Sequence, residues 1–328
     1  MTSSVFDILR CSICTGGLSR DGDYLICASC WAMFPIVGDI AVLLTEDDRP
    51  EISGQTGGHE RQRASVDIRP GFMFVSNESS LPDLRAVYEK AASEGKAMRL
   101  LRTDAFPETR YTSAELDRAL QSGRERVVDH SRAQSSRCIL NWPSGWGYSL
   151  HHLMSQVSQE ALVVAMDADF RTLASIQHYY DGKGLPADVL FVAANALKMP
   201  FRDGVFQSVI AADGSIETEN ADGCLAEIHR VLEDGGWVSI AGDVYTEGSA
   251  SMAAAEYWGL DSLATTDKLR SSMTRIGFTN ITHEVLYEGL DRDDGSIDDE
   301  ERCPLPARGD WFQHIAAAGQ RLQRRSSP

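Results

Sequence analysis

The stretch CILNWPSGWGYSLHHLMSQVSQEALVVAMD, residues 138–167, decides the fold. It opens with an apolar run and a turn that contains two glycines. Helical periodicity follows from Ser149, which we expect to cap the helix. Residues 161–166 are then a continuous apolar run, which is typical of a buried parallel strand. Asp167 stands at the carboxyl end of that run, and ligands bind at this edge of an open α/β sheet.

The same stretch predicts the chemical class of the ligand. Gly145 and Gly147 allow a ligand to approach the backbone of the turn closely. The helix after the turn presents free N–H groups and the positive end of its dipole, which suit a carboxylate or a phosphate. The carboxylate of Asp167 can accept hydrogen bonds from both hydroxyls of a ribose. The sequence therefore predicts a ligand that contains a nucleoside.

Strands continue to alternate with helices after Asp167. Further apolar runs typical of strands lie at residues 189–193, 206–212, 237–241 and 311–318. A helical pattern precedes the third of these runs, and we expect it to stop at Gly235 and Gly236. The alternation predicts an α/β fold with a doubly wound sheet over residues 126–328.

Four cysteines near the start of the chain predict a metal site. They form two C-x2-C pairs separated by twelve residues, namely Cys11, Cys14, Cys27 and Cys30. Four thiolates at this spacing suit tetrahedral Zn²⁺, and they leave no open coordination position for catalysis. We therefore expect residues 1–45 to be a small zinc ribbon. The metal either stabilises a unit too small to build its own core or shapes a surface that recognises a substrate or partner.

Residues 46–125 separate the ribbon from the α/β pattern. They begin with a polar, glycine-containing run that is typical of a linker, and residues 82–125 have helical periodicity. A helical segment ahead of a nucleotide-binding fold either covers its cleft as a lid or packs against it. We expect a linker followed by such a helical lid segment.

Composition limits the location and the partners. The chain has 328 residues, of which 43% are hydrophobic, and no apolar run approaches the roughly 20 residues that a membrane span needs. Its start lacks the features of a secretory signal, so we expect a cytoplasmic protein with no membrane partner. The net charge of −17 argues against broad nucleic-acid binding, because neutralising phosphates requires Lys and Arg.

Two segments resemble a known family. They are NALKMPFRDGVF, residues 195–206, and AEIHRVLEDGGW, residues 226–237. Both are similar to the class I S-adenosylmethionine-dependent methyltransferases, and residues 226–237 closely resemble that family's E-x-x-R-V-L-x-P-G-G segment. The resemblance implies a Rossmann-like methyltransferase sheet. A four-cysteine ribbon ahead of such a domain also resembles the ribosomal RNA guanine-N1 methyltransferases.

The resemblance implies the cofactor S-adenosyl-L-methionine and a set of residues that bind it. These residues are Asn141, Gly145, Gly147, Asp167, Asn195, Ala196 and Asp213. The two glycines would lie along the methionine half of the cofactor and Asp167 along the ribose. Asn195 and Ala196 would face the adenine. The chain departs from the family pattern at two of these positions, because asparagine replaces the usual acid at residues 141 and 195.

Methyl transfer from a sulfonium is an in-line displacement, which depends mainly on positioning. A hydroxyl nucleophile also needs a base, for which the candidates are His130, His151, His152 and Glu217. The sequence does not name the nucleophile.

Three functions remain open. The acidic charge favours a methyltransferase that acts on a small molecule. The domain order favours an rRNA or tRNA base methyltransferase. The altered glycine loop favours a non-catalytic protein that binds a partner. A dehydrogenase is disfavoured because G-x-G-x-x-G is absent. The oligomeric state stays open, with a homodimer among the options.

Overall fold

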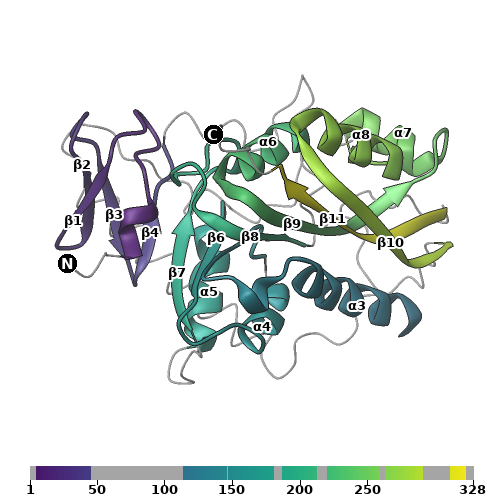
Figure 1. The fold of residues 1–328 in the computed structure, drawn as a ribbon, viewed down its shortest axis with the longest axis horizontal. Coiled ribbons are helices and arrows are strands. Elements are labelled where there is room, and N and C mark those ends of the chain that lie inside the picture. The colour runs from purple at the N-terminus through teal and green to yellow at the C-terminus, as the bar shows by residue number, and fades with distance from the viewer. Residues whose placement is uncertain are drawn as a thin grey trace, which may run out of the picture.

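The computed structural model describes residues 5–45, 114–145, 147–180, 187–212, 220–258, 263–290 and 311–322. Predictions that fall on other residues, including the linker and most of the helical lid segment, lie outside the described residues. The described part is built around one long sheet, which runs across the molecule in Figure 1.

The sheet has eleven strands in the order β1-β2-β3-β4-β7-β6-β5-β8-β9-β11-β10. Their bounds are β1 Leu18–Asp21, β2 Tyr24–Cys27, β3 Met33–Val37, β4 Ile40–Val42, β5 Cys138–Asn141, β6 Leu162–Asp167, β7 Asp188–Ala193, β8 Phe206–Ala211, β9 Leu232–Tyr245, β10 Phe278–Leu290 and β11 Trp311–Arg321. The six strands β4-β7-β6-β5-β8-β9, taken in their order in the sheet, pair in parallel. By contrast, β11 is antiparallel to both β9 and β10. The predicted doubly wound sheet is confirmed.

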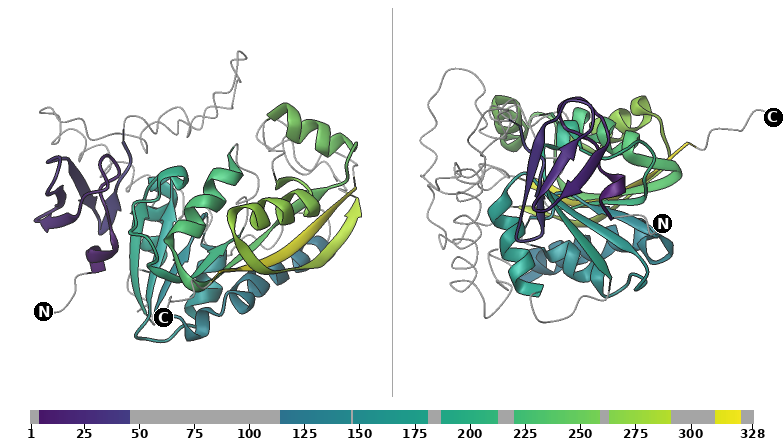
Figure 2. Two further views of the ribbon diagram at one scale, coloured as in Figure 1. Left: turned by 45° about the horizontal axis from the view of Figure 1, so that its top comes forward. Right: turned by 90° about the vertical axis from the view of Figure 1, so that its left-hand side faces the viewer.

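Helices cover both faces of this sheet (Figures 1 and 2). They are η1 Val5–Ile8, α3 Ala114–His130, η4 Ala133–Ser135, α4 Tyr148–Met154, α5 Phe170–Tyr180, η5 Ala196–Lys198, α6 Ala221–Val231, α7 Ala250–Trp258 and α8 Thr266–Ile276. α3, α4 and α5 share one hydrophobic cluster, α6 and α8 share a second, and α7 contributes to a third. Among these helices, none combines the length and the apolarity that a membrane crossing requires.

Burial on both faces explains why the central strands are apolar throughout. In β6, Val163 and Ala165 belong to the cluster beneath α5, whereas Val164 and Met166 belong to the cluster beneath α6. Alternate residues of a strand point to opposite faces, so a strand covered on both sides needs an apolar residue at every position. Parallel packing therefore produces the continuous run that the sequence displays.

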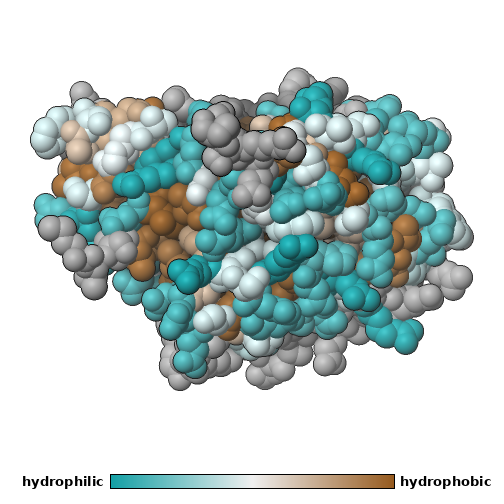
Figure 3. All heavy atoms as spheres, in the orientation of Figure 1, coloured by the Kyte–Doolittle hydropathy of each residue, from teal (hydrophilic) through white to brown (hydrophobic). Residues whose placement is uncertain are grey.

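The four-cysteine ribbon is continuous with this sheet. Its last strand, β4, pairs in parallel with β7, the outermost parallel strand of the α/β part. Leu9 and Phe34 of the ribbon lie in the same hydrophobic cluster as Leu140 of β5. Figure 3 shows hydrophobic atoms gathered over the junction of the ribbon with β7. The ribbon and the α/β part thus share one core.

The first helix after the glycine turn does not begin where the sequence suggested. Gly147, with a φ of 83°, is the N-cap of α4, and the helix starts at Tyr148. Ser149 lies inside the helix, where its hydroxyl accepts a hydrogen bond of 2.9 Å from the side-chain amide of Asn141. The expected Ser149 cap is therefore wrong, because this hydroxyl pairs with a buried amide rather than with the helix backbone.

The end of α6 also differs from the prediction. The helix ends at Val231, and Leu232 already belongs to β9, opposite Phe206. The pairing resumes with Trp237 opposite Ser208, so Gly235 and Gly236 lie in an irregular part of β9. The two glycines therefore shape a strand rather than stop a helix.

α3 joins the sheet more closely than the sequence suggested. It packs against β9, β10 and β11 and crosses the predicted boundary between residues 125 and 126. Its last turn leads through η4 to the start of β5. The final helix of the region predicted as a lid segment therefore belongs to the body of the α/β fold.

Candidate functional site

The carboxyl ends of the parallel strands gather the polar residues of the predicted site. Asn141, the last residue of β5, lies opposite Ala165 of β6 and Ile210 of β8. Asp167, the last residue of β6, lies opposite Ala193, which ends β7. These strands end at the same edge, where ligands bind in open α/β sheets.

Asp167 holds the glycine turn against the end of β6. Its carboxylate accepts a hydrogen bond of 2.8 Å from the backbone N–H of Gly145 and one of 3.0 Å from that of Asp169. Burial raises the pKa of Asp167 to about 6, although these N–H groups partly oppose the shift. A carboxylate offers about four lone-pair directions, so these bonds leave capacity for the hydroxyls of a ribose.

The two positions of the turn need glycine for different structural reasons. Gly145 has a φ of 48°, and an added Cβ would meet no described atom within 4 Å. Gly147 has a φ of 83°, and an added Cβ would lie 3.2 Å from Ile176 of α5. Gly145 therefore faces open space where a ligand can approach, whereas Gly147 is required for packing against α5.

Asn141 occupies the position where the family pattern has an acid. It is fully buried, and its side-chain amide donates to Ser149. Its Oδ1 has no hydrogen-bond partner among the described residues. A buried acceptor of this kind suits a donor such as the ammonium group of a methionine moiety. This unpaired oxygen fits the expected cofactor.

Asn195 and Ala196 lie directly after β7. The Oδ1 of Asn195 accepts a hydrogen bond of 2.8 Å from the backbone N–H of Leu197 and so caps η5. The backbone N–H of Ala194 donates to the carbonyl of Asp167 at 3.0 Å. The predicted adenine and ribose residues are therefore adjacent at the sheet edge.

The segment that resembles E-x-x-R has a structural role. Arg230 of α6 forms a bidentate ion pair with Glu227, with both N···O distances 2.7 Å. It also donates 2.8 Å hydrogen bonds to the carbonyls of Met199 and Phe201. The pair thus fastens α6 to the segment that follows Asn195.

The structure does not bring His130 to the carboxyl edge. His130 ends α3, and the next residue, Ser131, accepts a hydrogen bond from the hydroxyl of Ser208 near the start of β8. The start of a parallel strand lies at the edge opposite the ligand site. His130 is therefore removed as a candidate base, because the chain order places the end of α3 beside the beginning of β5.

The other candidate bases are not gathered at the site either. His151 stacks on Tyr180 at the end of α5, with ring centroids 6.4 Å apart. His152 contacts Gln156, whose side chain accepts from Gln134 of η4, just before β5 begins. His151 therefore packs against α5, and His152 is linked through Gln156 to η4. Glu217 and Asp213 lie outside the described residues.

A buried acid–imidazole pair was not anticipated. Asp243 of β9 and His314 of β11 are direct partners in the sheet, with Oδ1 and Nδ1 2.7 Å apart. His314 is 1% exposed, and its Nε2 has no partner among the described residues. That nitrogen lies 2.5 Å from where a Cβ on Gly123 of α3 would be. The imidazole is therefore sealed under α3 and packs there. Only the apolar run around residue 314 hinted at its burial.

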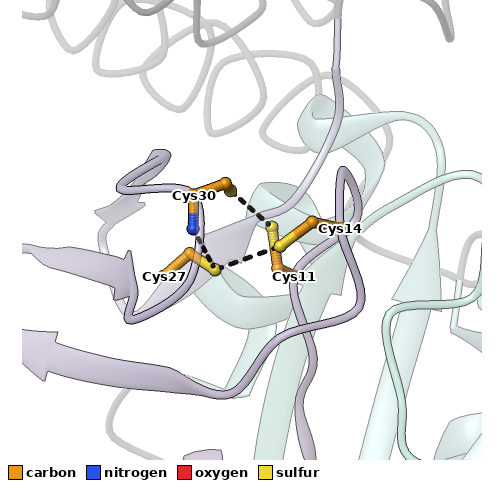
Figure 4. Close-up of side chains that lie close together, drawn as sticks. All are labelled: Cys11, Cys14, Cys27 and Cys30. Atoms are coloured by element: carbon orange, nitrogen blue, oxygen red, sulfur yellow. Dashed lines mark hydrogen bonds between the residues drawn. The ribbon is translucent and has the colours of Figure 1, made fainter.

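The four ribbon cysteines converge on one point (Figure 4). Their sulfur atoms all lie within 4.8 Å of one another. Cys11 and Cys30 have their Sγ atoms 3.6 Å apart, and Cys14 and Cys27 have theirs 3.4 Å apart. Tetrahedral zinc with bonds of about 2.3 Å separates its ligands by about 3.8 Å, so this geometry fits zinc.

The surroundings of the sulfurs differ. Burial raises the pKa of the Cys11 thiol to about 12. Burial acts in the same direction on Cys27, but backbone N–H groups of Cys30 and Ser29 donate to its sulfur and lower its pKa to about 6. Metal ligation requires thiolates, so a cation bound here must displace the proton of Cys11.

The parallel strands, the helices on both faces and the glycine turn at the carboxyl edge define a Rossmann-like methyltransferase fold. Residues 140–240 match a family model described as a methyltransferase domain. This segment begins in β5 and ends in β9, so it contains every described residue of the predicted cofactor site.

Individual proteins agree with this match. Over 113 residues the chain is 33% identical to demethylmenaquinone methyltransferase of Thermus thermophilus, covering 34% of this chain and 50% of that protein. The chain spans half or less of the length of the first curated relatives it matches.

Two solved structures share the fold at low identity. The cyclase SpnF is similar with a TM-score of 0.51 and 15% identity, covering 72% of this chain and 96% of that one. Haemonchus contortus phosphoethanolamine N-methyltransferase 2, in complex with S-adenosyl-L-methionine, has a TM-score of 0.50 and 16% identity, covering 76% of this chain and 62% of that one.

Proposed function

We propose that the chain is an S-adenosylmethionine-dependent methyltransferase that acts on a small molecule. The observation that carries the proposal is the overlap of two findings. The matched methyltransferase segment, residues 140–240, contains a glycine turn that is hydrogen-bonded to a carboxylate at the next strand end. This is the place where the fold binds a nucleoside.

In this proposal the sheet edge binds and orients the cofactor. Asp167 accepts hydrogen bonds from the ribose, Asn141 Oδ1 accepts one from the amino group, and Gly145 lets the methionine half approach the backbone. Asn195 and Ala196 lie beside the adenine. Bound S-adenosylmethionine supplies an electrophilic methyl group for in-line displacement. The chain's own contribution is position and orientation.

Charge supports a small molecule over RNA as the substrate. The chain carries a net charge of −17. The described ribbon has four aspartates against two arginines, which are Asp7, Asp21, Asp23 and Asp39 against Arg10 and Arg20. A ribbon that gripped RNA would need the opposite balance. The relative from Thermus thermophilus is named for a small molecule, demethylmenaquinone.

We also propose that the ribbon holds one structural Zn²⁺ through Cys11, Cys14, Cys27 and Cys30. The sulfur separations suit tetrahedral coordination, and four thiolates leave no position for a reacting ligand.

Isothermal titration with S-adenosylmethionine and S-adenosylhomocysteine tests the cofactor, with Asp167→Ala as the variant. Saturable binding that Asp167→Ala weakens supports the proposal. Methyl-labelled S-adenosylmethionine, incubated with separate small-molecule and RNA fractions, tests the substrate class. Label in the small-molecule fraction supports the proposal, and label in RNA alone contradicts it.

One observation favours a second candidate, a non-catalytic protein with the same fold. The usual acid is replaced by Asn141, and the side-chain amide of that residue is engaged with Ser149. Loss of a charge near a cationic sulfonium weakens its attraction. Folded, zinc-loaded protein that fails to bind S-adenosylmethionine would favour this candidate.

A further inference from the structure

Residues 193–203 run from the last residue of β7 through most of the connection to β8, and they contain Asn195 and Ala196. The ribbon holds the start of this segment. β4 pairs with β7 up to Val42 opposite Ala193, and the backbone N–H of Leu43 donates to the carbonyl of Ala193 at 2.8 Å. The register of the segment is therefore fixed by a strand that the ribbon supplies.

The ribbon also holds the end of the segment. Leu9 bridges Phe201 in antiparallel fashion. The backbone N–H of Arg10 donates to the carbonyl of Pro200, and that of Arg202 donates to the carbonyl of Ile8, each at 2.9 Å. Leu9 and Phe201 are both fully buried, so the apolar core also holds the two segments together at this bridge.

Side chains of the ribbon add to this hold. The guanidinium of Arg10 lies 3.4 Å from Asp203 and 4.0 Å from Glu227. Glu227 is the partner of Arg230, which itself bonds the carbonyls of Met199 and Phe201. Arg10 thus joins the Arg230–Glu227 ion pair that already fastens α6 to the segment.

The metal ligands lie directly beside both points of attachment. Cys11 follows Arg10, and its backbone N–H closes the first cysteine turn on the carbonyl of Gly16 at 2.8 Å. Ser12 comes next, and its hydroxyl donates to the carbonyl of Leu43 at 2.6 Å. A metal that holds Cys11 in place therefore also restrains its two neighbours. Arg10 contacts residues 193–203, and Ser12 contacts Leu43, which follows β4.

We propose that the ribbon positions residues 193–203 for adenine, so that zinc in the four-cysteine site sets the affinity for S-adenosylmethionine. The proposal rests on the proposed function. Arg10 and Ser12 act as positioning residues, because they contact the segment and its support rather than the cofactor. Zinc narrows the conformations of the segment, and the cofactor then binds a site that is already ordered.

The test uses the 328-residue chain, loaded with zinc, and two pairs of variants. Cys14→Ser removes the exposed ligand of the metal site, and Cys138→Ser is its control because Cys138 lies at the start of β5, away from the ribbon. Arg10→Gln removes the side-chain contact with zinc retained. Arg20→Gln is its control, because the Arg20 side chain hydrogen-bonds Gly22 within its own hairpin.

Two quantities are measured, the Kd for S-adenosylmethionine and the amide hydrogen exchange of residues 193–203. We expect Cys14→Ser to raise the Kd about tenfold, within the usual range of coupling between sites. We expect Arg10→Gln to raise it less, and both variants to exchange faster in this segment. The controls should match the wild type in both measurements.

Each failure has its own meaning. Wild-type protein that does not bind S-adenosylmethionine defeats the proposed function. Wild-type protein that binds it, with both ribbon variants equal to their controls in Kd and in exchange, overturns the inference alone. Circular dichroism at the measuring temperature establishes that Cys14→Ser remains folded, and Arg10→Gln tests the same link without disturbing the metal.

Discussion

At the scale of single residues, Asp167 carries the chemistry of the predicted site. It is half-buried at a strand end, and its carboxylate accepts two backbone hydrogen bonds. Burial nevertheless keeps its pKa raised, to about 6. A group that titrates so near neutrality makes cofactor binding depend on pH.

We expect the affinity for S-adenosylmethionine to fall in acid. Ribose hydroxyls donate to the ionised carboxylate, so binding favours the charged form of Asp167. The affinity should be fully present above about pH 7 and should fall about tenfold for each unit below about pH 6. Titration calorimetry across this range measures the dependence.

Asp167→Asn is the matched control for this pH dependence. Its amide is nearly the same size but does not titrate, so binding should be weaker near neutral pH and level through the acid range. A wild-type protein whose affinity stays level to about pH 5 would show that this carboxylate does not hold the ribose.

At the scale of elements, the Arg230–Glu227 pair holds α6 to the connection between β7 and β8. Lysine cannot reproduce a bidentate contact with a carboxylate or reach both carbonyls. We expect Arg230→Lys to lower the free energy of unfolding by about 2 kcal/mol, because the pair is mostly buried. Denaturant unfolding measures this.

Arg275 supplies the comparison for that variant. Its ion pair with Asp222 has the same 2.7 Å distance, but its side chain is 63% exposed. We expect Arg275→Lys to change the free energy of unfolding by less than about 0.5 kcal/mol. Equal losses of unfolding free energy in Arg230→Lys and Arg275→Lys would contradict a stabilising role for the Arg230–Glu227 pair.

The contact of α3 with β11 depends on Gly123. A methyl group there would lie 2.5 Å from Nε2 of His314, which is buried and held by Asp243. Alanine favours a helix by up to about 1 kcal/mol, but overpacking costs about 1 to 3 kcal/mol. We expect Gly123→Ala to destabilise the protein in denaturant unfolding.

A double-mutant cycle separates the two effects on α3. His314→Ala removes the ring, so Gly123→Ala should be neutral or stabilising in that background. An equal cost of Gly123→Ala in both backgrounds would show that the ring is not the obstacle.

Local patterns in the sequence predicted the elements but not their contacts. The strands ending at Asp167 and Ala193 were predictable, because burial on both faces requires apolar residues in sequence order. The pairing of β4 with β7 was not, since partners far apart in sequence leave no local pattern. For the same reason, the position of His130 could not be known before the structure placed the end of α3 beside the start of β8.

The site itself was predictable only in part. The glycine turn and Asp167 follow a recognisable spacing, and the structure links them by a hydrogen bond. The pair of Asp243 and His314 depends on two strands that meet across the sheet, so no spacing in the sequence indicates it. Site residues that lie close together in the sequence can therefore be predicted from their spacing. Site residues that meet only because two distant strands pair in the sheet cannot.

At the scale of the whole molecule, the ribbon and the α/β part are one structural unit. β4 is hydrogen-bonded into the sheet, and Leu9, Phe34 and Phe201 share a core cluster. Units that share a core and a sheet are expected to unfold together, whereas units joined only by a linker unfold separately. A Zn²⁺ ion bound by the four ribbon cysteines, as proposed, would therefore stabilise the entire described fold.

Removal of zinc tests whether the ribbon and the α/β part unfold together. Because binding to the folded state alone stabilises it, a chelator should lower the melting temperature of the whole protein. We expect calorimetry to record one transition with zinc and one, at lower temperature, without it. Added zinc should restore the first value. Two separate transitions, with the chelator abolishing only the smaller, would mean that the ribbon folds on its own despite the strand it contributes to the sheet.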